Sequence, residues 1–268
     1  MKSNLIRQRL AEGKVPIGHM VMEFGTRGIA KIIESTGVDF VLLDMEHGGR
    51  DFASICDLLA WFKSTPVTPI VRVPSADYHF IARVMDAGAQ GVMVPNVRSV
   101  EQARRVITAL RFAPDGDRGL GLGGAQNNYI RPKLVEYMEA SNQSNIFLCQ
   151  IESTQALDDI DAIASLPGVD NLWVGHMDLS QSMGIVGQFE NPVFVDAFCK
   201  VTDAAQRHNK SSGIQPGSLK EARIWLELGF NVISYSVDHS VYSTALKENV
   251  DALRSTEKAS SKGNGSDD

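Results

Sequence analysis

Short apolar runs rich in β-branched residues alternate with longer stretches of helical periodicity along almost the whole chain. This alternation predicts βα units around a parallel sheet, because parallel neighbours need a crossover connection between them. The strand-like runs lie at 16–22, 39–44, 69–73, 91–94, 146–151, 171–175, 212–215 and 231–235. Helical periodicity follows them, at 27–36, 51–63, 78–87, 99–110, 154–165, 191–208, 218–228 and 240–254.

Eight such pairs predict a single α/β domain, a closed (β/α)8 TIM barrel over residues 1–255 of the 268. A doubly wound open sheet is the competing architecture. It usually has fewer strands and a glycine-rich phosphate loop after the first one, which 23–28 matches poorly. Residues 256–268 are small, polar and charged, and we expect a disordered tail there. The glycine-rich region 111–145 is expected to be an irregular loop lining the mouth of the barrel.

Composition excludes several classes of protein. The net charge is −6 and no basic stripe stands out, so we expect no nucleic-acid partner. The N-terminus lacks the apolar core of a signal peptide, and no apolar run is long enough to span a bilayer. Cys56, Cys149 and Cys199 are far apart and form no metal-binding spacing, which favours buried thiols in a reducing compartment. We therefore expect a cytoplasmic protein without membrane contact.

Polar residues gather after several predicted strands, and in a barrel these strand ends form the reactive face. The residues concerned are Asp44, Glu46 and His47 after the second strand, Arg72 in the third, Gln150 and Glu152 after the fifth, and His176 and Asp178 after the sixth.

Glu152 and Asp178 are the candidate metal ligands. Two carboxylates without clustered Cys or His suit a hard cation such as Mg²⁺ or Mn²⁺, which could polarise a ketone and stabilise an enolate. Each acid alone could instead favour the first turn of the helix that follows it. His176 lies beside Asp178 and could reach either the metal or the substrate.

Arg72 and His47 are the candidate catalytic side chains. A guanidinium in an apolar strand is costly unless it is paired, either with a ligand oxygen or with a structural acid across the barrel. His47 follows Asp44 and Glu46, one of which could orient its ring for proton transfer. No lysine lies on a predicted strand, which disfavours a Schiff-base mechanism and favours a metal-dependent one.

With these residues in place, the chain resembles the HpcH/HpaI family of class II, metal-dependent pyruvate aldolases over about residues 4–255. The resemblance rests on GVDFVLLDMEHG at 37–48, PIVRVP at 69–74, MDAGAQGVMVPNV at 85–97, RFAPDGDRG at 111–119, LCQIES at 148–153 and GVDNLWVGHMDLSQSMG at 168–184. It implies reversible cleavage of a 4-hydroxy-2-oxo acid to pyruvate, or a close 2-oxo acid, and an aldehyde.

The resemblance also implies roles for single residues. Glu152 and Asp178 correspond to the metal ligands, with Mg²⁺, Mn²⁺ or Co²⁺ as the ion. Arg72 corresponds to the residue that holds the enolate oxygen, and His47 with Asp44 to a catalytic dyad. The substrate-binding positions are Gln150, which contacts substrate, the backbone amides of Gly175, His176 and Met177, which bind the pyruvate carboxylate, and Asp86, which reaches a neighbouring subunit's site.

The family implies a homo-oligomer, commonly a hexamer built from dimers that exchange C-terminal helices, so 240–254 is expected to pack on a partner chain. The chain departs from the family pattern near the pocket. It has His176-Met177 in place of Pro-Ala/Ser, Gly18-His19-Met20-Val21 where a tryptophan is frequent, and 119–129 without the usual arginine. These differences concern the acceptor pocket and leave the aldehyde open.

Other functions remain open from the sequence. The same barrel and metal would suit an oxaloacetate decarboxylase, or an acyl-CoA lyase of the citrate lyase β-subunit type. The acyl-CoA lyase hypothesis requires basic residues near the mouth to bind the nucleotide phosphates. The candidates are scattered along the chain, namely Arg98, Arg104, Arg105 and Arg118. A non-catalytic sensor of 2-oxo acids is a third reading, although it has no need for a proton relay.

Overall fold

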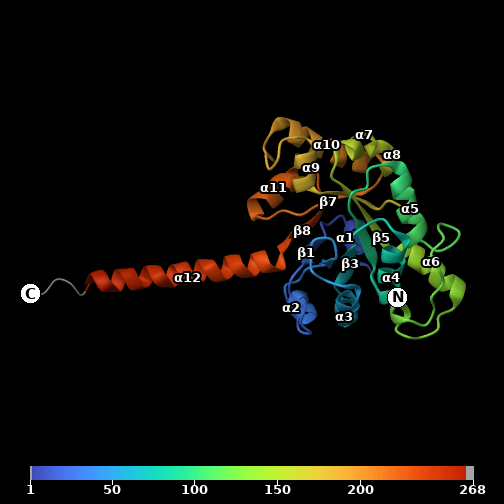
Figure 1. Ribbon diagram of the computed structural model, residues 1–268, viewed down its shortest axis with the longest axis horizontal. Coiled ribbons are helices and arrows are strands. Elements are labelled where there is room, and N and C mark those ends of the chain that lie inside the picture. Colours follow the sequence, from blue (N-terminus) through green and yellow to red (C-terminus); the bar gives the residue numbers. More distant parts are fainter. Residues whose placement is uncertain (1, 264–268) are drawn as a thin grey trace, which may run out of the picture.

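The computed structural model describes residues 2–263 and shows, within them, eight parallel strands closed into a barrel (Figure 1). Each strand pairs with its neighbours in chain order, and β1 pairs with β8 to close the ring. The expected (β/α)8 barrel is thus confirmed. The strands are β1 (Ile17–Val21), β2 (Phe40–Asp44), β3 (Thr68–Arg72), β4 (Gly91–Val94), β5 (Ile146–Ile151), β6 (Asn171–Val174), β7 (Ser211–Ile214) and β8 (Val232–Val237).

The expected helices surround this barrel with small shifts at their ends, and the range 154–165 divides into two helices. They are α2 (Ile29–Ser35), α3 (Phe52–Phe62), α4 (Tyr78–Ala87), α5 (Val100–Leu110), α7 (Thr154–Asp158), α8 (Ile160–Ala164), α10 (Pro192–Arg207) and α11 (Leu219–Glu227). Side-chain caps begin several of them. The Ser218 hydroxyl, for example, accepts a hydrogen bond from the Glu221 amide. The Glu221 carboxylate in turn accepts one from the Ser218 amide, which completes a capping box.

The strands bury side chains on both faces, which produces two apolar cores. Alternate residues such as Leu42, Ile70 and Leu148 fill the inside of the barrel, whereas the residues between them pack against the surrounding helices. This alternation continues to the strand ends. It directs the side chains of Asp44 and Arg72, two positions after Leu42 and Ile70, into the carboxyl end of the barrel, here called the mouth. The amino-terminal ends of the strands form the base.

Three helices lie outside the predicted ranges. Helix α1 (Leu5–Ala11) closes the base, where Ile6 is fully buried with the residues inside the barrel. Helix α6 (Leu134–Ser144) precedes β5, and α9 (His176–Ser182) follows β6 directly. All three have weak signals, because α1 and α9 have only seven residues and α6 is largely polar.

The region 111–145 corrects our expectation in two respects. It contains α6 and a 3₁₀ turn, η1 (Ala125–Asn127), and it lies at the base of the barrel rather than over the mouth. Lys63, just after α3, hydrogen-bonds the Ala125 carbonyl there. The reason is topological. A helix that follows a strand returns the chain to the base, and this region follows α5.

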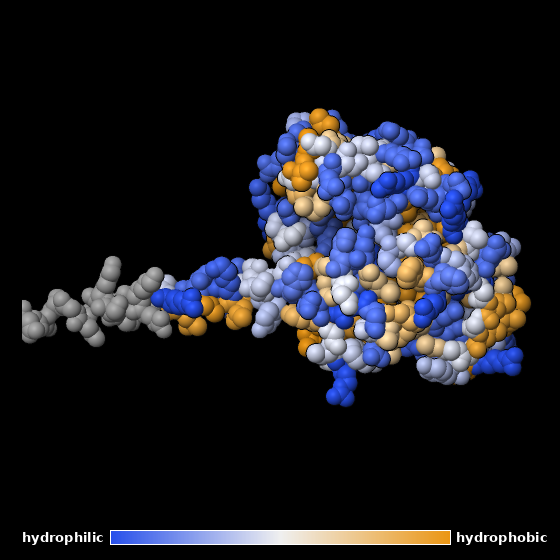
Figure 2. Space-filling model, viewed as in Figure 1, coloured by the Kyte–Doolittle hydropathy of each residue, from blue (hydrophilic) through white to orange (hydrophobic). Residues whose placement is uncertain are grey.

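Helix α12 (Asp238–Gly263) starts at the mouth and projects far from the barrel (Figure 1). It is longer than the expected 240–254 and continues beyond residue 255, where we expected the barrel domain to end. The rest of the expected tail, 264–268, lies outside the described residues. An apolar stripe is visible along one side of this helix (Figure 2). Tyr242, Leu246 and Leu253 are 59%, 50% and 69% exposed, although the Tyr242 ring makes an edge-on contact with Phe24, so most of this face is uncovered within the described chain. In residues 2–263, every helix is too short or too polar to cross a membrane.

Candidate active site at the barrel mouth

Asp44 and Arg72 form a buried ion pair at the mouth. They are register partners at the ends of β2 and β3, and Arg72 Nε donates to Asp44 Oδ1 at 2.7 Å. Burial alone would raise the pKa of Asp44, but the hydrogen bond and the charge of Arg72 outweigh it and hold that pKa below its ordinary value. This pairing fixes the guanidinium plane and leaves its remaining nitrogens for other partners.

Glu46 is the second acid beside Arg72. Its Oε2 lies 3.2 Å from Arg72 Nη1 and 3.7 Å from the His47 Nε2. Burial raises the pKa of Glu46, although the charges of Arg72 and His47 oppose the rise. Asp44, in contrast, accepts a hydrogen bond from the His47 backbone amide at 3.2 Å. The acid nearest the imidazole ring is therefore Glu46, whereas the sequence resemblance implied a His47–Asp44 dyad.

Glu152 lies just after β5, buried to 4% exposure. Its Oε1 accepts from the Asn96 amide at 2.5 Å, and its Oε2 accepts from Gln150 Nε2. Burial raises the pKa of Glu152 to about 7; the two hydrogen bonds oppose this rise, and the charges of Glu46 and Asp178 add to it. The carboxylates at the mouth thus repel one another, and a bound cation would relieve that repulsion.

Gly175 makes room for this carboxylate. A β-carbon at position 175 would lie 2.9 Å from both the Gln150 Nε2 and the Glu152 Cβ, far inside normal contact. Glycine is therefore required between β6 and α9 for a steric reason, in addition to any role of its amide. That amide already donates to the Ile151 carbonyl at 3.1 Å in the sheet.

Asp178 lies in the first turn of α9 and is exposed. It lines the mouth cavity and, together with Glu152, an adjoining hollow of about 430 Å³. Within residues 2–263 no group of three or more His, Cys, Asp or Glu side chains could hold a metal ion. A cation here would therefore have two protein carboxylates and would complete its shell with water or substrate, which suits Mg²⁺ or Mn²⁺.

Unpaired acceptor atoms support a cation at this place. Among the described residues, Gln150 Oε1 and Glu46 Oε2 are buried atoms without a hydrogen-bond partner, although Glu46 Oε2 lies 3.2 Å from Arg72 Nη1 in an ion pair. Buried acceptors of this kind are costly when nothing satisfies them. With Glu152 and Asp178 they make the mouth rich in oxygen ligands, so its residues fit a hard divalent cation.

His176 and Met177 have different environments. The His176 ring packs against Phe189 and Trp225, with centroids 5.1 Å from each, and burial lowers its pKa. It therefore belongs to an aromatic cluster at the rim, although it also lines the cavity. Met177 is 54% exposed and lines the same cavity.

The cavity at the mouth has a volume of about 350 Å³. Its polar lining includes His47, Arg72 and Gln150, and Met20 and Val237 are among its apolar residues. A space of this size fits a small substrate of about ten non-hydrogen atoms. Its combination of the buried Arg72 guanidinium, the Asp178 carboxylate and an apolar wall suits a small oxo acid.

Asp86 is the predicted site residue that does not join this group. It lies at the end of α4, near the base, and accepts a hydrogen bond from Arg118 Nη2 at 2.6 Å. Its expected role in a neighbouring subunit's site stays a prediction.

Sequence reasoning missed two residues that support the site. The Asn96 amide reaches Glu152 because Asn96 adopts a left-handed conformation, with φ 54°. Asp238, at the start of α12, accepts hydrogen bonds from the amides of Met22, Glu23 and Phe24 at 3.1, 2.9 and 2.7 Å. Asp238 could have been found as an acid that follows the eighth strand. Asn96 could have been found as an asparagine just after the fourth strand, because asparagine tolerates the left-handed conformation.

Residues 25–244 match the family model described as HpcH/HpaI aldolase/citrate lyase. The chain is 31% identical over 248 residues to the hydroxypyruvate/pyruvate aldolase of Agrobacterium fabrum, with 91% of each chain covered. It is 30% identical over 224 residues to the 5-keto-4-deoxy-D-glucarate aldolase of Escherichia coli, covering 84% of this chain and 87% of the relative. The structure of an HpcH/HpaI aldolase from Desulfitobacterium hafniense superposes with a TM-score of 0.88 at 29% identity, covering 93% and 96% of the two chains.

Proposed function

We infer the function from one premise: this chain belongs to the HpcH/HpaI aldolase/citrate lyase family. We propose that it is a class II aldolase that reversibly cleaves a 4-hydroxy-2-oxo acid to pyruvate, or a close 2-oxo acid, and an aldehyde. The main support is that Arg72, held by Asp44, lines the mouth cavity together with Asp178, and that Asp178 also lines the adjoining hollow together with Glu152.

Glu152 and Asp178 would hold the divalent metal, with Mg²⁺ or Mn²⁺ as the preferred ions and Co²⁺ as an alternative. The bound ion would polarise the ketone of the substrate and stabilise negative charge on its oxygen. Gln150 donates to Glu152 and so orients the ligand carboxylate. Both carboxylates must be ionised for this role, and the cation would lower the pKa of Glu152 from its value near 7 in the free protein.

Arg72 would bind the oxo oxygen of the substrate. Asp44 fixes its Nε, and the one hydrogen-bond partner of Nη2 among the described residues is the Met20 sulfur, a weak acceptor at 3.9 Å. This nitrogen can therefore donate to an oxygen that becomes negatively charged when the carbon–carbon bond breaks. The substrate carboxylate would lie at the start of α9. Since the Gly175 amide is occupied in the sheet, we assign this contact to the amides of His176 and Met177.

His47 would move the proton. Cleavage breaks the C3–C4 bond, leaves its electron pair on the 2-oxo fragment as an enolate, and turns the C4 hydroxyl into an aldehyde carbonyl. The hydroxyl proton passes to the His47 imidazole, which is 58% exposed at the rim and stands beside Glu46. Protonation of the enolate carbon then gives the methyl group of pyruvate. Condensation follows the same steps in reverse.

The acyl-CoA lyase alternative finds no support in the placement of basic residues. Arg118 is buried at the base and pairs with Asp86, and Arg105 pairs with Glu101 on the surface of α5. Arg104 lines a hollow near Asp170, at the base. Of the four candidates, only Arg98 lines a hollow at the mouth. Oxaloacetate decarboxylation remains an alternative, because it passes through the same enolate.

We also propose that the protein assembles as a homo-oligomer, with a hexamer as the expected form, by exchanging α12 between chains. The occupant of the apolar face of α12 would be a second copy of this chain. The support is its length of 26 residues and the exposure of Tyr242, Leu246 and Leu253.

Pyruvate release tests the proposed reaction. It is measured by coupling to lactate dehydrogenase with a panel of 4-hydroxy-2-oxo acids and oxaloacetate, after EDTA treatment and after Mg²⁺ or Mn²⁺ is restored. Metal-dependent release from the hydroxy-oxo acids is the expected result. Release from oxaloacetate alone would favour the decarboxylase, and no release from any compound would contradict pyruvate chemistry at this site.

A further inference from the structure

The pairing of β1 with β8 contains a β-bulge at the mouth. Gly18 of β1 faces Ser234 of β8. Met20, two positions later, faces Val237, three positions later, so β8 has one extra residue here. Ser236, within this bulge, adopts a left-handed conformation with φ 53° and lines the mouth cavity. Residues strained in this way and β-bulges both gather at functional sites, so the bulge points to a role in ligand binding.

Three hydrogen bonds hold the bulge in place. The Tyr235 carbonyl accepts from Nδ1 of the His19 ring at 2.8 Å, so the imidazole has its proton on that nitrogen. The Ser236 amide donates to the Pro216 carbonyl at 2.9 Å, and the Ser236 carbonyl accepts from Gln215 Nε2 at 3.3 Å. Backbone groups that the bulge removes from the β1–β8 ladder thus keep partners. The bulge is therefore a fixed part of the fold.

The bulge turns the Val237 side chain into the barrel. Side chains alternate along a strand, and Ile233 faces the surrounding helices. Without the extra residue, Val237 would face the helices as well, because it lies four positions after Ile233. It instead packs against the residues inside the barrel and lines the mouth cavity. Met20 and Met22, at the end of β1, do the same. We call Met20, Met22 and Val237 the apolar wall.

The apolar wall lies across the barrel from the proposed metal site. In the closed ring, β1 lies opposite β5, which positions Glu152, whereas His47 follows β2, the neighbour of β1. In the cleavage proposed above, the 2-oxo fragment binds at the metal and the C4 hydroxyl meets His47. The substituent on C4, which becomes the side chain of the aldehyde, therefore extends toward the apolar wall.

The charges at the mouth favour an uncharged substituent. Among the lysines and arginines of the described chain, Arg72 alone lines the mouth cavity, and it already pairs with Asp44 and Glu46. A carboxylate or phosphate on the aldehyde would thus find no second cation in its own chain. Ser236 and Ser240 also line this cavity, so an aldehyde with hydroxyl groups is the competing class.

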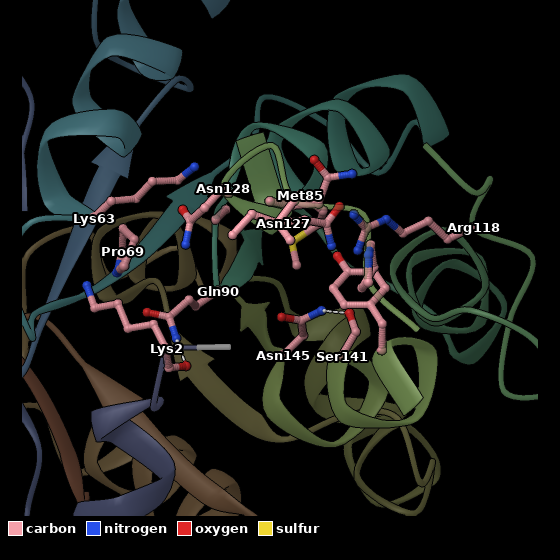
Figure 3. A pocket seen from close by; sticks show the side chains of 16 residues that line it. Lys2, Lys63, Pro69, Met85, Gln90, Arg118, Asn127, Asn128, Ser141 and Asn145 are labelled. Carbon is pink, nitrogen blue, oxygen red and sulfur yellow. Dashed lines mark hydrogen bonds between the residues drawn. The ribbon is translucent and has the colours of Figure 1, made fainter. Parts of the chain in front are cut away.

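A second pocket, of about 300 Å³ at the base, has its charged side chains engaged by the fold (Figure 3). Lys2 donates to two backbone carbonyls, and Lys63 donates to one. Arg118 pairs with Asp86. An acidic ligand there would have to displace these contacts. The choice of substrate is therefore assigned to the mouth, where the apolar wall meets the cavity.

We propose, on the basis of the proposed function, that the aldehyde has a short apolar side chain held by Met20, Met22 and Val237. The flexible thioethers of the two methionines suit an aliphatic chain, because they adapt to its shape. The cavity fits about ten non-hydrogen atoms, and pyruvate takes about six of them. The aldehyde therefore has about three or four carbons.

Condensation of pyruvate with matched aldehydes tests the proposal in the full-length, metal-loaded protein. Butanal and succinate semialdehyde have the same number of carbons and end in a methyl group or a carboxylate. Propanal and glyceraldehyde also match in length and differ in hydroxyl groups. The apolar member of each pair should have a kcat/KM at least about tenfold higher, since a single methylene in an apolar pocket contributes about this much. Consumption of pyruvate measures each rate.

Two variants of the apolar wall test its part in this preference. Met22→Ala should lower the ratio of kcat/KM for butanal to that for succinate semialdehyde by about tenfold. Val237→Thr, which adds a hydroxyl group with little change of shape, should lower it at least about threefold. Loss of folded protein affects both aldehydes equally and leaves the ratio unchanged. Met138→Ala, at a half-buried methionine of α6 outside the cavity, is the matched control and should keep the parent ratio.

Deuterium exchange of the pyruvate methyl group, followed by NMR, separates this inference from the proposed function. Exchange requires the enolate but no aldehyde. If the parent exchanges these protons, the apolar aldehyde would be overturned by absent condensation, by equal or reversed preferences, or by parent ratios in both wall variants. The proposed enolate chemistry would then still stand. Absence of both exchange and condensation would overturn the proposed function, and this inference with it.

Discussion

Two networks of arginine and carboxylate, one around Asp170 at the base of the barrel and one around Arg72 at the mouth, differ in how completely their polar atoms are satisfied. At the base, Asp170 accepts hydrogen bonds from Arg7 Nη2 at 2.7 Å, from Arg111 Nη2 at 2.9 Å and from the Phe147 amide at 2.8 Å. Arg111 also donates to the Asn145 carbonyl at 3.0 Å. At the mouth, Arg72 pairs with Asp44 and Glu46, yet a Glu46 oxygen and Gln150 Oε1 have no hydrogen bond within the described residues.

This difference distinguishes arginine and carboxylate side chains that stabilise the fold from those that can bind a ligand. A fully paired network contributes to the fold because every buried charge has its partners. An incompletely paired one keeps donors and acceptors for a ligand, and it stays in place only because the surrounding barrel holds it. The Arg–Asp contact therefore has a different role in the Asp170 network than in the Asp44–Arg72 pair at the mouth.

The largest effect is expected at the mouth. Glu152→Gln should reduce kcat by about a thousandfold or more, because it removes one of the two carboxylates that we propose as metal ligands while the shape of the side chain is kept. Steady-state pyruvate release measures this loss. Glu139→Gln, at an exposed glutamate of α6, is the matched control. A Glu152→Gln enzyme with the parent kcat would show that the metal site has been placed wrongly.

The next effect concerns the base. Asp170→Ala should lower the free energy of unfolding by about 4 kcal/mol, because it leaves Arg7 and Arg111 without their shared partner. Denaturant unfolding measures the change. The activity of the molecules that remain folded should be close to that of the parent. If this variant lost activity without losing stability, the two ends would not differ in the way described.

A pH dependence of stability should appear at the mouth in the metal-free protein. The pKa of Glu152 is raised by burial to about 7 in the folded state, above its ordinary value of 4.5. The folded protein therefore binds a proton that the unfolded chain releases. This contribution is fully present below about pH 4.5 and is lost as the pH rises through about 7, with a total of up to about 3 kcal/mol.

Thermal unfolding of the metal-free protein between pH 5 and 8 measures this slope. It should be smaller in Glu152→Gln, which has no proton to lose, and also in the presence of Mg²⁺ or Mn²⁺. Identical slopes in the parent and the variant would assign the effect to other groups.

The smallest effect on the single chain is expected from α12. Leu246→Glu combined with Leu253→Glu should change the stability of the barrel by no more than about 0.5 kcal/mol, because both side chains are exposed in one chain. The assembly should nevertheless dissociate, and light scattering after size exclusion measures its mass. Lys247→Gln together with Asn249→Glu, on the same helix, keeps Leu246 and Leu253 intact and changes the net charge by the same amount. An unchanged mass in the leucine variant would contradict helix exchange.

Much of the fold followed from local patterns. Strands such as β2 and β5 are continuous apolar runs, and glycines such as Gly88 end helices in the left-handed conformation. The position of 111–145 could not be predicted from the sequence. Its composition indicates a loop, but composition does not show which end of the barrel a loop covers. Helices α1 and α9 are too short for a clear period.

The candidate site residues could be predicted where each is positioned by the end of a single strand. Asp44, Arg72, Gln150 and Glu152 could be found because each stands at or just after the end of a strand. Their pairing could not, since both Asp44 and Glu46 were within reach of His47 in the sequence. The choice of Glu46 as the acid nearest the ring results from how the chain turns after β2, where Asp44 accepts the amides of the next residues.

The hydrogen bonds of Asp238 to the loop after β1 have a consequence for the order of folding during synthesis. They join residues that are 214 to 216 positions apart, and β1 has no β8 to pair with until Val232–Val237 has been translated. Until then β1 is an open edge, which exposes unpaired backbone groups to other nascent chains. The amides of Met22, Glu23 and Phe24 bind the Asp238 carboxylate and so fix the end of β8 beside β1. The pairing of β8 with β1 thus closes the barrel and covers the open edge of β1 in one late step.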